Sequence, residues 1–435
     1  MALPIVAVVG RPNVGKSTLV NRVTQQTEAI VHEARGVTRD RSYHQADWNG
    51  VYFLLIDTGG IEAGGIDDFQ TSIRNQAIMA TQEADAIVFL VDGKTGLTPD
   101  DEEVARILKR AGKPTFLAVN KMDTPNRDDE IHEFWGLGLG QPWPVSATHG
   151  HGTGDILDEI VKALPASDPL PDDGAIDVAI IGRPNAGKSS LLNKLSGVDR
   201  AIVSDVAGTT RDAIDMLVTR DDAKYRLIDT AGIRRKALID QDVEYYGFVR
   251  AMRAIDRAQV ALLVIDSTIG LTDQDQRVAN FAAERGCAMI ILLNKWDALE
   301  TQEEKDAIET RVEERLGFVS YATVLRISAL TGKGVERIWK AIDTAFANYS
   351  QEISTSRLNK LLTEMRDFGH TVSKGKQTLR VNYVTQTRTA PPGFTFFANH
   401  PVLADDNFRR YVENRMRAAF DLSGTPIMLK FRKKD

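Results

Sequence analysis

Short apolar runs alternate with amphipathic stretches over most of the chain. The apolar runs are Ile5–Val9, Tyr52–Ile56, Ala86–Val91, Thr115–Val119, Val178–Ile181, Tyr225–Ile228, Val260–Ile265 and Met289–Leu293. Such runs are typical of strands buried on both faces, and the apolar spacing of Thr98–Ala111 is typical of an amphipathic helix. The alternation predicts an α/β fold with a mostly parallel sheet, helices on both of its faces, and ligand-binding loops at the carboxyl ends of the strands.

The last segment, residues 351–435, has a different pattern that predicts helix, strand, strand, helix, strand. The strands are predicted at Leu379–Tyr383, Phe394–Ala398 and Thr425–Phe431. The two helices carry apolar residues at helical spacing: Leu358, Leu361, Leu362, Met365 and Phe368 in the first, and Phe408, Tyr411, Val412, Met416 and Phe420 in the second. A platform of aromatic residues that stacks on bases is the alternative interpretation, but the helical spacing favours a packed core.

Short motifs recur along the chain in the same order, which indicates two copies of one domain. Gly10, Thr38 and Asp57 each match a residue 172 positions later, and the later motifs are 174 and 182 positions apart. Between the copies, residues 166–175 form an acidic, proline-rich stretch that predicts a stiff linker. The predicted organisation is a first domain at 1–165, the linker, a second domain at 176–350 and a third, α+β domain at 351–435.

Each copy opens with a predicted phosphate-binding loop between a strand and a helix. In such a loop, backbone N–H groups surround phosphate oxygens, the lysine reaches the outer phosphates and the following hydroxyl ligates Mg²⁺. The predicted nucleotide-binding residues of these loops are Gly10, Asn13, Val14, Gly15, Lys16, Ser17 and Thr18 in the first copy, and Gly182, Asn185, Ala186, Gly187, Lys188, Ser189 and Ser190 in the second.

A second motif, Asn-Lys-x-Asp, follows an apolar run in each copy and predicts the choice of base. Its carboxylate accepts hydrogen bonds from guanine N1–H and the N2 amine, whereas adenine would leave the carboxylate unpaired. GTP and GDP are therefore the expected nucleotides. The residues predicted to hold the base are Asn120, Lys121, Asp123, Ser146 and Ala147 in the first copy, and Asn294, Lys295, Asp297, Ser328 and Ala329 in the second.

Other residues of each copy predict a metal ion and a γ-phosphate sensor. Asp57 and Asp229 follow apolar runs and are expected beside Mg²⁺, with Ser17 and Ser189. Thr38 and Thr210 are expected to ligate it only when the γ-phosphate is present, and Thr209 is a competing choice beside Thr210. Backbone N–H groups of Gly60 and Gly232 are expected near the γ-phosphate. The predicted catalytic set is Lys16, Thr38, Gly60, Lys188, Thr210 and Gly232.

The residue after each of these glycines is isoleucine, Ile61 or Ile233, where many GTPases have a water-orienting glutamine. An isoleucine does not orient water, so another group is needed for hydrolysis. The amide oxygens of Asn13 and Asn185 are candidates for holding a monovalent cation, K⁺, beside the β- and γ-phosphates.

Together, the duplicated GRPNxGKS, GxTRD, DTxG, NKxD and SA motifs and the small basic C-terminal segment resemble the bacterial double-Era GTPases, the Der or EngA family. The resemblance covers the whole chain. It implies two tandem P-loop GTPase domains, a KH-like C-terminal domain packed between them, and a role in assembly of the large (50S) ribosomal subunit. It also implies a hydrophobic residue in place of the catalytic glutamine and K⁺-stimulated hydrolysis. Residues 351–435 lack the G-x-x-G sequence of ordinary KH domains, which argues against base-specific RNA reading.

The charge distribution is consistent with an RNA partner. The formal net charge is −6, yet residues 350–435 contain 15 Lys and Arg against 8 Asp and Glu, leaving −13 for residues 1–349. The candidates for contact with ribosomal RNA are Arg409, Arg410, Arg415, Arg417, Lys430, Arg432, Lys433 and Lys434, with a solvated helix face as the alternative. The run Arg234-Arg235-Lys236 is either an exposed loop or a switch segment.

Several function classes are disfavoured. One cysteine, Cys287, in an apolar run predicts a buried filler and no disulfide framework. No apolar run approaches the roughly 20 residues of a membrane span, and the histidines show no zinc-ligand spacing. A partner enzyme in tRNA modification would need a separate catalytic domain, and a membrane-associated or filament-forming GTPase would need an amphipathic or lipidated anchor. We expect a cytoplasmic monomer.

Overall fold

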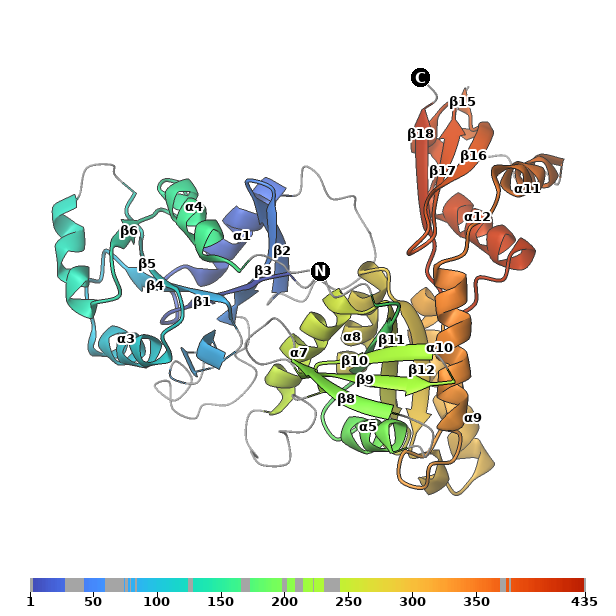
Figure 1. Cartoon of the computed structure of the whole chain (residues 1–435). Helices are drawn as coiled ribbons and strands as arrows, with labels where there is room; N and C mark the ends of the chain where they lie inside the picture. Colours follow the sequence, from blue (N-terminus) through green and yellow to red (C-terminus); the bar gives the residue numbers. More distant parts are fainter. Residues whose placement is uncertain are drawn as a thin grey trace. The chain divides into compact units, whose positions relative to one another are not determined.

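The computed structural model describes residues 3–27, 43–58, 74, 77–78, 80–82, 84–123, 128–165, 173–197, 202–207, 214–221, 223–230, 243–367, 373–374 and 377–433. The chain forms two compact units, Met1–Pro169 and Leu170–Asp435 (Figure 1). Several predicted features lie outside the described residues: Thr38, Gly60, Ile61, Thr209, Thr210, Gly232, Ile233, residues 234–236, Phe368, Lys434 and residues 166–172 of the linker.

The first unit is built on a six-stranded sheet. In sheet order its strands are β2 (Tyr43–Trp48), β3 (Val51–Asp57), β1 (Ile5–Val9), β4 (Ala86–Asp92), β5 (Thr115–Asn120) and β6 (Pro142–Pro144). All neighbours pair in parallel except β2 and β3. The predicted mostly parallel sheet is therefore confirmed. Its four long apolar runs are the central strands, whose residues are almost all buried.

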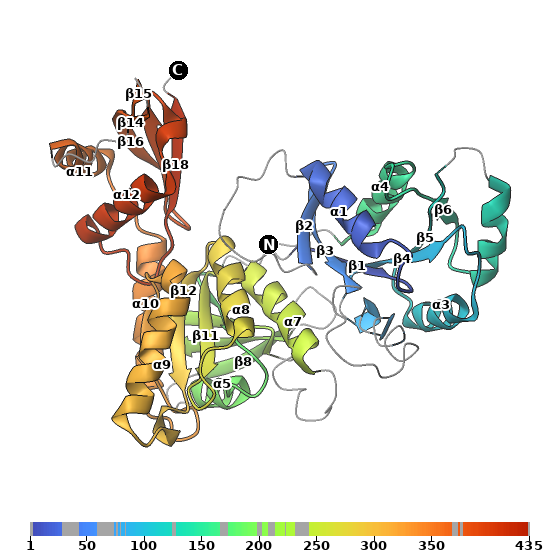
Figure 2. The same cartoon turned by 180° about the vertical axis from the view of Figure 1, so that it is seen from behind.

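The helices of the first unit lie on both faces of this sheet (Figures 1 and 2). They are α1 (Lys16–Thr27), α3 (Pro99–Ala111) and α4 (Thr153–Ala163), with a 3-10 segment η2 at Asp128–Leu137. Thr98 caps α3 by accepting a hydrogen bond from the Asp101 N–H, and Asp101 accepts one from the Thr98 N–H in return. This reciprocal cap fixes the predicted start of α3.

The second unit repeats the design with a seven-stranded sheet. In sheet order its strands are β13 (Thr323–Arg326), β12 (Ala288–Asn294), β11 (Val260–Asp266), β7 (Ile176–Ile181), β10 (Ala223–Ile228), β9 (Ile214–Arg220) and β8 (Ile202–Ala207). The strands from β13 to β10 pair in parallel, while β9 pairs antiparallel with both β10 and β8. The short apolar runs again coincide with the central strands.

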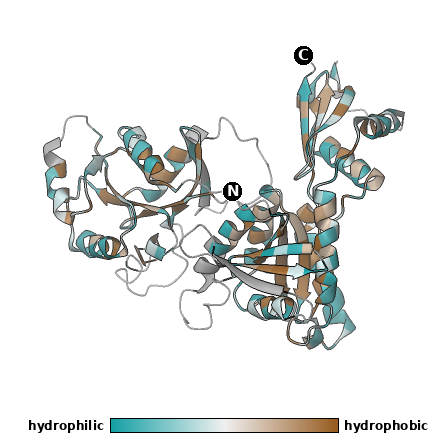
Figure 3. Ribbon diagram, in the orientation of Figure 1, coloured by the Kyte–Doolittle hydropathy of each residue, from teal (hydrophilic) through white to brown (hydrophobic). Residues whose placement is uncertain are grey.

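Alternate residues of the central strands face two separate layers of helices. Val178 and Ile180 of β7 belong to one apolar core, and Ala179 and Ile181 belong to the other. Figure 3 shows that hydrophobic residues are concentrated on the strands and on one side of the surrounding helices. The helical elements are α5 (Lys188–Ser196), α7 (Val243–Arg257), α8 (Asp273–Glu284), η4 (Trp296–Ala298), α9 (Gln302–Arg315), η5 (Gly317–Val319) and α10 (Glu336–Tyr349).

One buried ion pair distinguishes the second sheet from the first. Arg226 on β10 is 2% exposed and donates to Asp177 on the adjacent β7 at 2.6 Å and to Asp173 at 2.6 Å. Arg226 and Asp177 are directly opposite each other across the two strands. The corresponding opposite pair in the first sheet is Leu54 and Ile5. The same pair of opposed strand positions is therefore occupied by charged residues in the second copy and by apolar residues in the first.

The remainder of the second unit has the predicted order of helix, strand, strand, helix, strand. Its main elements are α11 (Thr355–Asp367), β16 (Val381–Arg388), β17 (Gly393–Ala398), α12 (Asp406–Ala419) and β18 (Met428–Lys433), accompanied by the hairpin β14 (Ser373–Lys374) and β15 (Gln377–Thr378) and by η6 (Pro401–Leu403). The three main strands form one sheet with β17 in the centre. β17 pairs antiparallel with β16 and parallel with β18.

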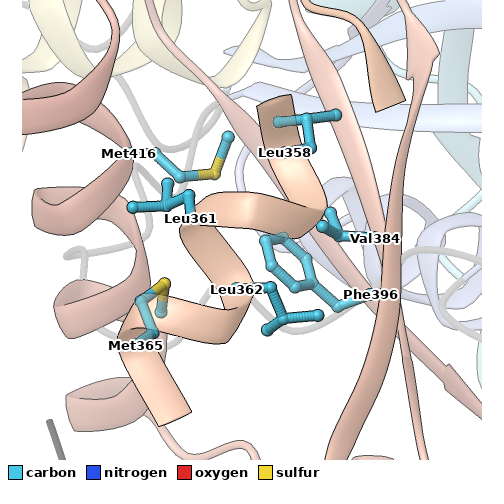
Figure 4. A pocket seen from close by; sticks show the side chains of 7 residues that line it. All are labelled: Leu358, Leu361, Leu362, Met365, Val384, Phe396 and Met416. Carbon is cyan, nitrogen blue, oxygen red and sulfur yellow. The ribbon is translucent and has the colours of Figure 1, made fainter. Parts of the chain in front are cut away.

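The aromatic and aliphatic stripes of this part form a packed core, as the helical spacing predicted. Figure 4 shows apolar side chains from α11 and α12 meeting those of the sheet, and the residues are Leu358, Leu361, Leu362, Met365, Val384, Phe396 and Met416. The expected alternation over Leu379–Tyr383 holds only as far as Val381. The pairing register shifts between Val381 and Tyr383, so Tyr383 is 43% exposed and Val384 is buried instead.

A glycine joins this C-terminal part to the preceding sheet. Gly424 accepts a hydrogen bond from the Met289 N–H of β12 at 2.8 Å, and its own N–H donates to the Tyr321 carbonyl at 2.7 Å. Its φ is +74°, and a Cβ at this position would come within 2.9 Å of the Cβ of Ala345. Thr425 adds a hydrogen bond to the Ala345 carbonyl at 2.8 Å. Glycine is therefore required at a close backbone contact.

Candidate nucleotide sites

Each phosphate loop lies between the first strand of its sheet and the following helix. In the first copy the loop joins β1 to α1, which begins at Lys16, and in the second it joins β7 to α5, which begins at Lys188. A helix N-terminus has N–H groups without intrahelical partners and a partial positive charge, so it favours a phosphate group. The strand, loop and helix that the motif requires are present twice.

The lysine of each loop is held by the loop itself. Lys16 Nζ donates to the carbonyl oxygens of Gly10 at 2.6 Å and Arg11 at 2.9 Å. Lys188 Nζ donates to Gly182 at 2.6 Å and Arg183 at 2.5 Å. These contacts hold the ammonium groups at the loops where the sequence places the outer phosphates. Binding of phosphate would replace carbonyl contacts by charged ones, which are stronger hydrogen bonds.

The asparagine of each Asn-Lys-x-Asp motif connects two loops of its site. In the second copy, Asn294 Nδ2 donates to the Ala186 carbonyl at 2.7 Å, and its Oδ1 accepts from the Ala329 N–H at 2.8 Å. Asn120 makes the same two bonds to Val14 and Ala147, at 2.7 and 2.9 Å. The buried amide thus joins the phosphate loop to the loop expected at the guanine carbonyl, a role that the motif alone did not reveal.

This arrangement explains a glycine in each phosphate loop. Gly15 and Gly187 both have φ of +100°, and a Cβ added to either would collide with the amide nitrogen of Asn120 or Asn294. The glycine and the asparagine are therefore one structural requirement, although 105 or more residues separate them in sequence. The sign of this pairing in the sequence was that both residues recur in each copy, at separations of 105 and 107 residues.

The lysine of each Asn-Lys-x-Asp motif is fixed by an aspartate at the end of a neighbouring strand. Lys121 Nζ contacts Asp92 Oδ2 at 2.5 Å, and Lys295 Nζ contacts Asp266 Oδ2 at 2.6 Å. Burial raises the pKa of each aspartate, but hydrogen bonds from the lysine and nearby groups outweigh it, so both pKa values lie below the usual range. Both aspartates therefore remain charged and orient the lysines at neutral pH.

Sequence reasoning missed Asp92 and Asp266. Each follows an apolar run, ends β4 or β11, and recurs at the interval of 174 residues that separates the two Asn-Lys-x-Asp motifs. That shared interval was the available sign.

The predicted metal-site aspartates lie at the carboxyl end of the strands that follow the switch positions. Asp57 is the last residue of β3 and is 1% exposed, and the next residue, Thr58, donates to the Val8 carbonyl at 2.7 Å. Asp229 directly follows β10 and has a φ of +56°. These positions place both aspartates at the sheet edge where β1 and β7 enter the phosphate loops.

The other predicted loop residues differ in burial. Val14, Lys16, Ala186, Asn120, Asn294, Ser146, Ala147, Ser328 and Ala329 are buried, whereas Asn13, Ser17, Thr18, Asn185, Ser190 and Asp297 are exposed. The candidate potassium ligands Asn13 and Asn185 have φ of +63° and +62°, a backbone region that asparagine enters more readily than most residues. Their exposed side chains leave the amide oxygens accessible.

The carboxylates predicted to select the base have different surroundings in the two copies. Asp123 Oδ2 forms an ion pair with Lys94 at 2.6 Å, and Oδ1 accepts from the Ser146 hydroxyl at 2.9 Å. Ser328, the counterpart of Ser146, accepts from the Thr331 N–H at 3.1 Å, just as Ser146 accepts from the His149 N–H at 3.3 Å. Within the described part of the chain, Asp297 has no ion pair or hydrogen bond to its carboxylate. The first carboxylate is engaged and the second is open.

A phosphate-loop arginine also contacts a buried aspartate in each copy. Arg11 Nε donates to Asp101 Oδ1 at 2.9 Å, and Asp101 is fully buried at the start of α3. In the second copy Arg183 Nη2 lies 3.6 Å from Asp266 Oδ2. Asp275, the equivalent of Asp101, has an Oδ1 without a hydrogen bond in the described structure. These arginines were not among the predicted site residues.

The donor set fits Mg²⁺ only together with a nucleotide. Hydroxyl and carboxylate oxygens, as offered by Ser17 with Asp57 and by Ser189 with Asp229, are the hard ligands that Mg²⁺ prefers. Among the described residues, no group of three or more His, Cys, Asp or Glu side chains is placed to hold a metal ion. Phosphate oxygens and water would therefore complete the coordination.

In the part of the chain that the structure describes, no helix combines the length and apolar character required to span a bilayer. Cys287 is buried, and burial raises the pKa of its thiol to about 12. It is a packed core residue, as predicted.

Comparison with known proteins identifies the parts of the chain. A family model described as "50S ribosome-binding GTPase" matches residues 5–121 and 177–295. A model described as "KH-domain-like of EngA bacterial GTPase enzymes, C-terminal" matches residues 352–432. Proteins named GTPase Der are similar over the full length: that of Symbiobacterium thermophilum is 49% identical over 99% of this chain and 93% of its own, and that of Moorella thermoacetica is 46% identical over 100% and 99%.

These matches agree with the geometry of the two sheets. Both phosphate loops and the Asn-Lys pair that opens each Asn-Lys-x-Asp motif lie within the matched GTPase residues, and the C-terminal match runs from before α11 to Arg432 of β18. The chain therefore has two guanine-nucleotide-binding GTPase domains and a KH-like C-terminal domain, and it belongs to the GTPase Der family.

Proposed function

We propose that this protein is a GTP-hydrolysing switch in the assembly of the large (50S) ribosomal subunit, acting as a cytoplasmic monomer with the 50S subunit and its rRNA as partners. The observation that carries the proposal is the duplicated site, in which a buried asparagine joins a phosphate loop to a base loop in both copies. The match to ribosome-binding GTPases supports the choice of partner. The domain limits that we propose are 1–165, 176–350 and 351–435.

The residues of each copy have separate tasks in this proposal. Backbone N–H groups of the loop and helix N-terminus bind the phosphates, and Lys16 or Lys188 neutralises charge as it develops on the outer phosphates. Asp123 or Asp297 selects guanine through N1–H and the N2 amine. Thr38 and Gly60, and their counterparts Thr210 and Gly232, respond to the γ-phosphate. Its loss releases their loops, which gives two conformational states.

The proposal includes two cations at each site. Ser17, Thr38 and Asp57 would hold Mg²⁺ in the first copy, and Ser189, Thr210 and Asp229 in the second, where the ion neutralises charge on the β- and γ-phosphates. Asn13 and Asn185 would hold K⁺ through their exposed amide oxygens. Because Ile61 and Ile233 do not orient water, this monovalent cation is the source of positive charge that we propose for hydrolysis.

We expect Asp297→Asn to change the base preference of the second site. The carboxylate accepts two hydrogen bonds from guanine, whereas an amide donates to the carbonyl of xanthine. GDP affinity should fall roughly 100-fold or more, given about 1.5–3 kcal/mol for each hydrogen bond to a charged group, while XDP affinity should rise. Isothermal titration of the full-length protein with each nucleotide measures both. Unchanged GDP binding would contradict the assignment, and Asp123→Asn provides the matched variant of the first site.

We expect Asn185→Ala to remove any difference between K⁺ and Na⁺ at the second site. Phosphate release should be measured in a Lys16→Ala background, which silences the first site, at equal ionic strength in the two salts. The rate in K⁺ should fall to the rate in Na⁺, because alanine offers no oxygen ligand. A K⁺ dependence that persists would assign the cation to other ligands. Asn13→Ala in a Lys188→Ala background is the matched test of the first site.

Sedimentation on sucrose gradients tests the cellular role. The full-length protein is incubated with ribosomal subunits in the presence of a GTP analogue, GDP or no nucleotide, and its position is followed across the gradient. We expect co-migration with the 50S peak that depends on the nucleotide. Absence from the 50S fractions in all three states would reject the proposed function.

A further inference from the structure

The base-selecting carboxylate of the first copy is already bound by its own chain. Lys94 Nζ lies 2.6 Å from Asp123 Oδ2, and the Ser146 hydroxyl donates to Oδ1 at 2.9 Å. A third group, His149 Nε2, lies 4.0 Å from Asp123 Oδ1. The Lys94 and Ser146 hydrogen bonds and the Lys94 charge lower the pKa of Asp123, so the carboxylate is charged at neutral pH. Both oxygens that guanine requires therefore have a partner.

The second copy lacks every one of these contacts. The residue equivalent to Lys94 is Thr268, whose hydroxyl donates to Asp266 Oδ1 at 2.6 Å. Its backbone N–H donates to the same oxygen at 3.0 Å, just as the Lys94 N–H donates to Asp92 at 2.9 Å. The two loops therefore have the same local hydrogen bond, and their side chains differ: the threonine is fixed to the aspartate, and the lysine extends to the base-selecting carboxylate.

Because of this difference, a guanine base would meet a free carboxylate in the second copy and an already paired carboxylate in the first. In the second copy the base meets Asp297, which is exposed and has no partner within the described structure. In the first copy the N1–H and N2 amine approach a carboxylate whose Oδ2 is already paired with the Lys94 ammonium. A carboxylate has about four acceptor sites, so the Ser146 hydrogen bond to Oδ1 is compatible with a bound base, and the Lys94 ammonium is the group that competes with it. Loss of an existing ion pair subtracts from the free energy of binding, and for a pair as exposed as Lys94 with Asp123 the effect is small but measurable.

We infer that Lys94 is a specificity-site residue that lowers the guanine-nucleotide affinity of the first copy relative to the second by competing with the base for Asp123. The inference rests on the proposed binding of guanine nucleotides at both sites. It assigns the difference between the copies to one side chain at equivalent positions, Lys94 and Thr268. It also makes the affinity of the first site depend on ionic strength, because an exposed ion pair weakens as salt increases.

Exchange of these two residues tests the inference in the full-length protein. The first site is read with GDP by isothermal titration in a Lys188→Ala background, which silences the second. Lys94→Thr should bind GDP about two- to fivefold more tightly than its parent at low salt. The ratio should approach one in 1 M NaCl. Conversely, Thr268→Lys in a Lys16→Ala background should weaken GDP binding at the second site by a similar factor.

Lys109→Thr is the control for charge. Lys109 is exposed on α3 and forms no ion pair with Asp123, so its replacement changes the net charge equally and should leave the affinity unchanged. Equal or weaker GDP binding by Lys94→Thr would overturn the inference, as would an equal gain in Lys109→Thr. If neither parent background binds GDP at all, the proposed function itself fails, which separates the two outcomes.

Discussion

Asn294→Ala should abolish GDP binding at the second site and destabilise the second unit. The substitution leaves the Ala186 carbonyl and the Ala329 N–H without their partner, and both residues are buried. An unpaired buried backbone group costs about 1–3 kcal/mol, so the free energy of unfolding should fall by roughly 2–6 kcal/mol. Urea denaturation followed by circular dichroism, with and without GDP, measures the loss of stability and the loss of binding in one experiment.

Asn294→Asp separates the two contacts. The aspartate oxygen still accepts from the Ala329 N–H, but its second oxygen faces the Ala186 carbonyl oxygen and brings a buried charge without a partner, so we expect a loss at least as large as that in Asn294→Ala. Asn120→Ala applies the same test to the first unit through Val14 and Ala147. Wild-type stability together with wild-type GDP affinity in Asn294→Ala would show that the two loops are held by other contacts.

Arg226→Leu should destabilise the second unit by about 3–5 kcal/mol, whereas Asp177→Ile/Arg226→Leu should be close to wild type or more stable. Removal of the arginine alone leaves a buried carboxylate without its partner, which is costly. The double variant installs the residues that occupy the equivalent opposed positions in the first unit, Ile5 and Leu54. Thermal and urea denaturation of the three proteins compares them directly.

The same variants have an expected pH dependence. Burial raises the pKa of Asp177 to about 6, against an ordinary value of 3.8, although Arg226 opposes the shift. Between these two values the folded state holds the proton more tightly than the unfolded state, so the contribution of Asp177 to the free energy of unfolding falls as the pH rises from about 4 to 6. The double variant should lack this contribution. If the Arg226→Leu variant were as stable as wild type at neutral pH, the predicted cost of leaving Asp177 without its partner would be contradicted.

The sequence predicted the central strands well because burial on both faces demands continuous apolar runs. Residues 5–9 coincide with β1, and the runs at 86–91 and 260–265 differ from β4 and β11 by one residue. The edge strands of the six- and seven-stranded sheets were missed for the converse reason. β2 reads Tyr-His-Gln-Ala-Asp-Trp, and such a strand, paired on one side only, needs no apolar run.

The sequence predicted which loops form the candidate sites, but not the hydrogen bonds and ion pairs that connect these loops to one another. Motif spacing located the phosphate and base loops because those functions depend on local backbone and on single side chains. The bonds from Asn120 to Val14 and from Arg11 to Asp101 join residues 106 and 90 positions apart, and they follow from the packing of parallel strands. The ion pair of Lys94 with Asp123 was equally invisible, since no local pattern distinguishes a lysine that points to solvent from one that reaches a neighbouring loop.

The contact at Gly424 connects β12 to the KH-like domain. One end of this strand carries Asn294, which joins the phosphate loop to the loop of Ala329, and near its other end Met289 is hydrogen-bonded to Gly424 of the KH-like domain. At about 3.3 Å per residue, the two points are less than 20 Å apart along a single stiff backbone. The candidate base-binding loop and the KH-like domain are therefore connected through one continuous hydrogen-bonded strand, without a loop in between.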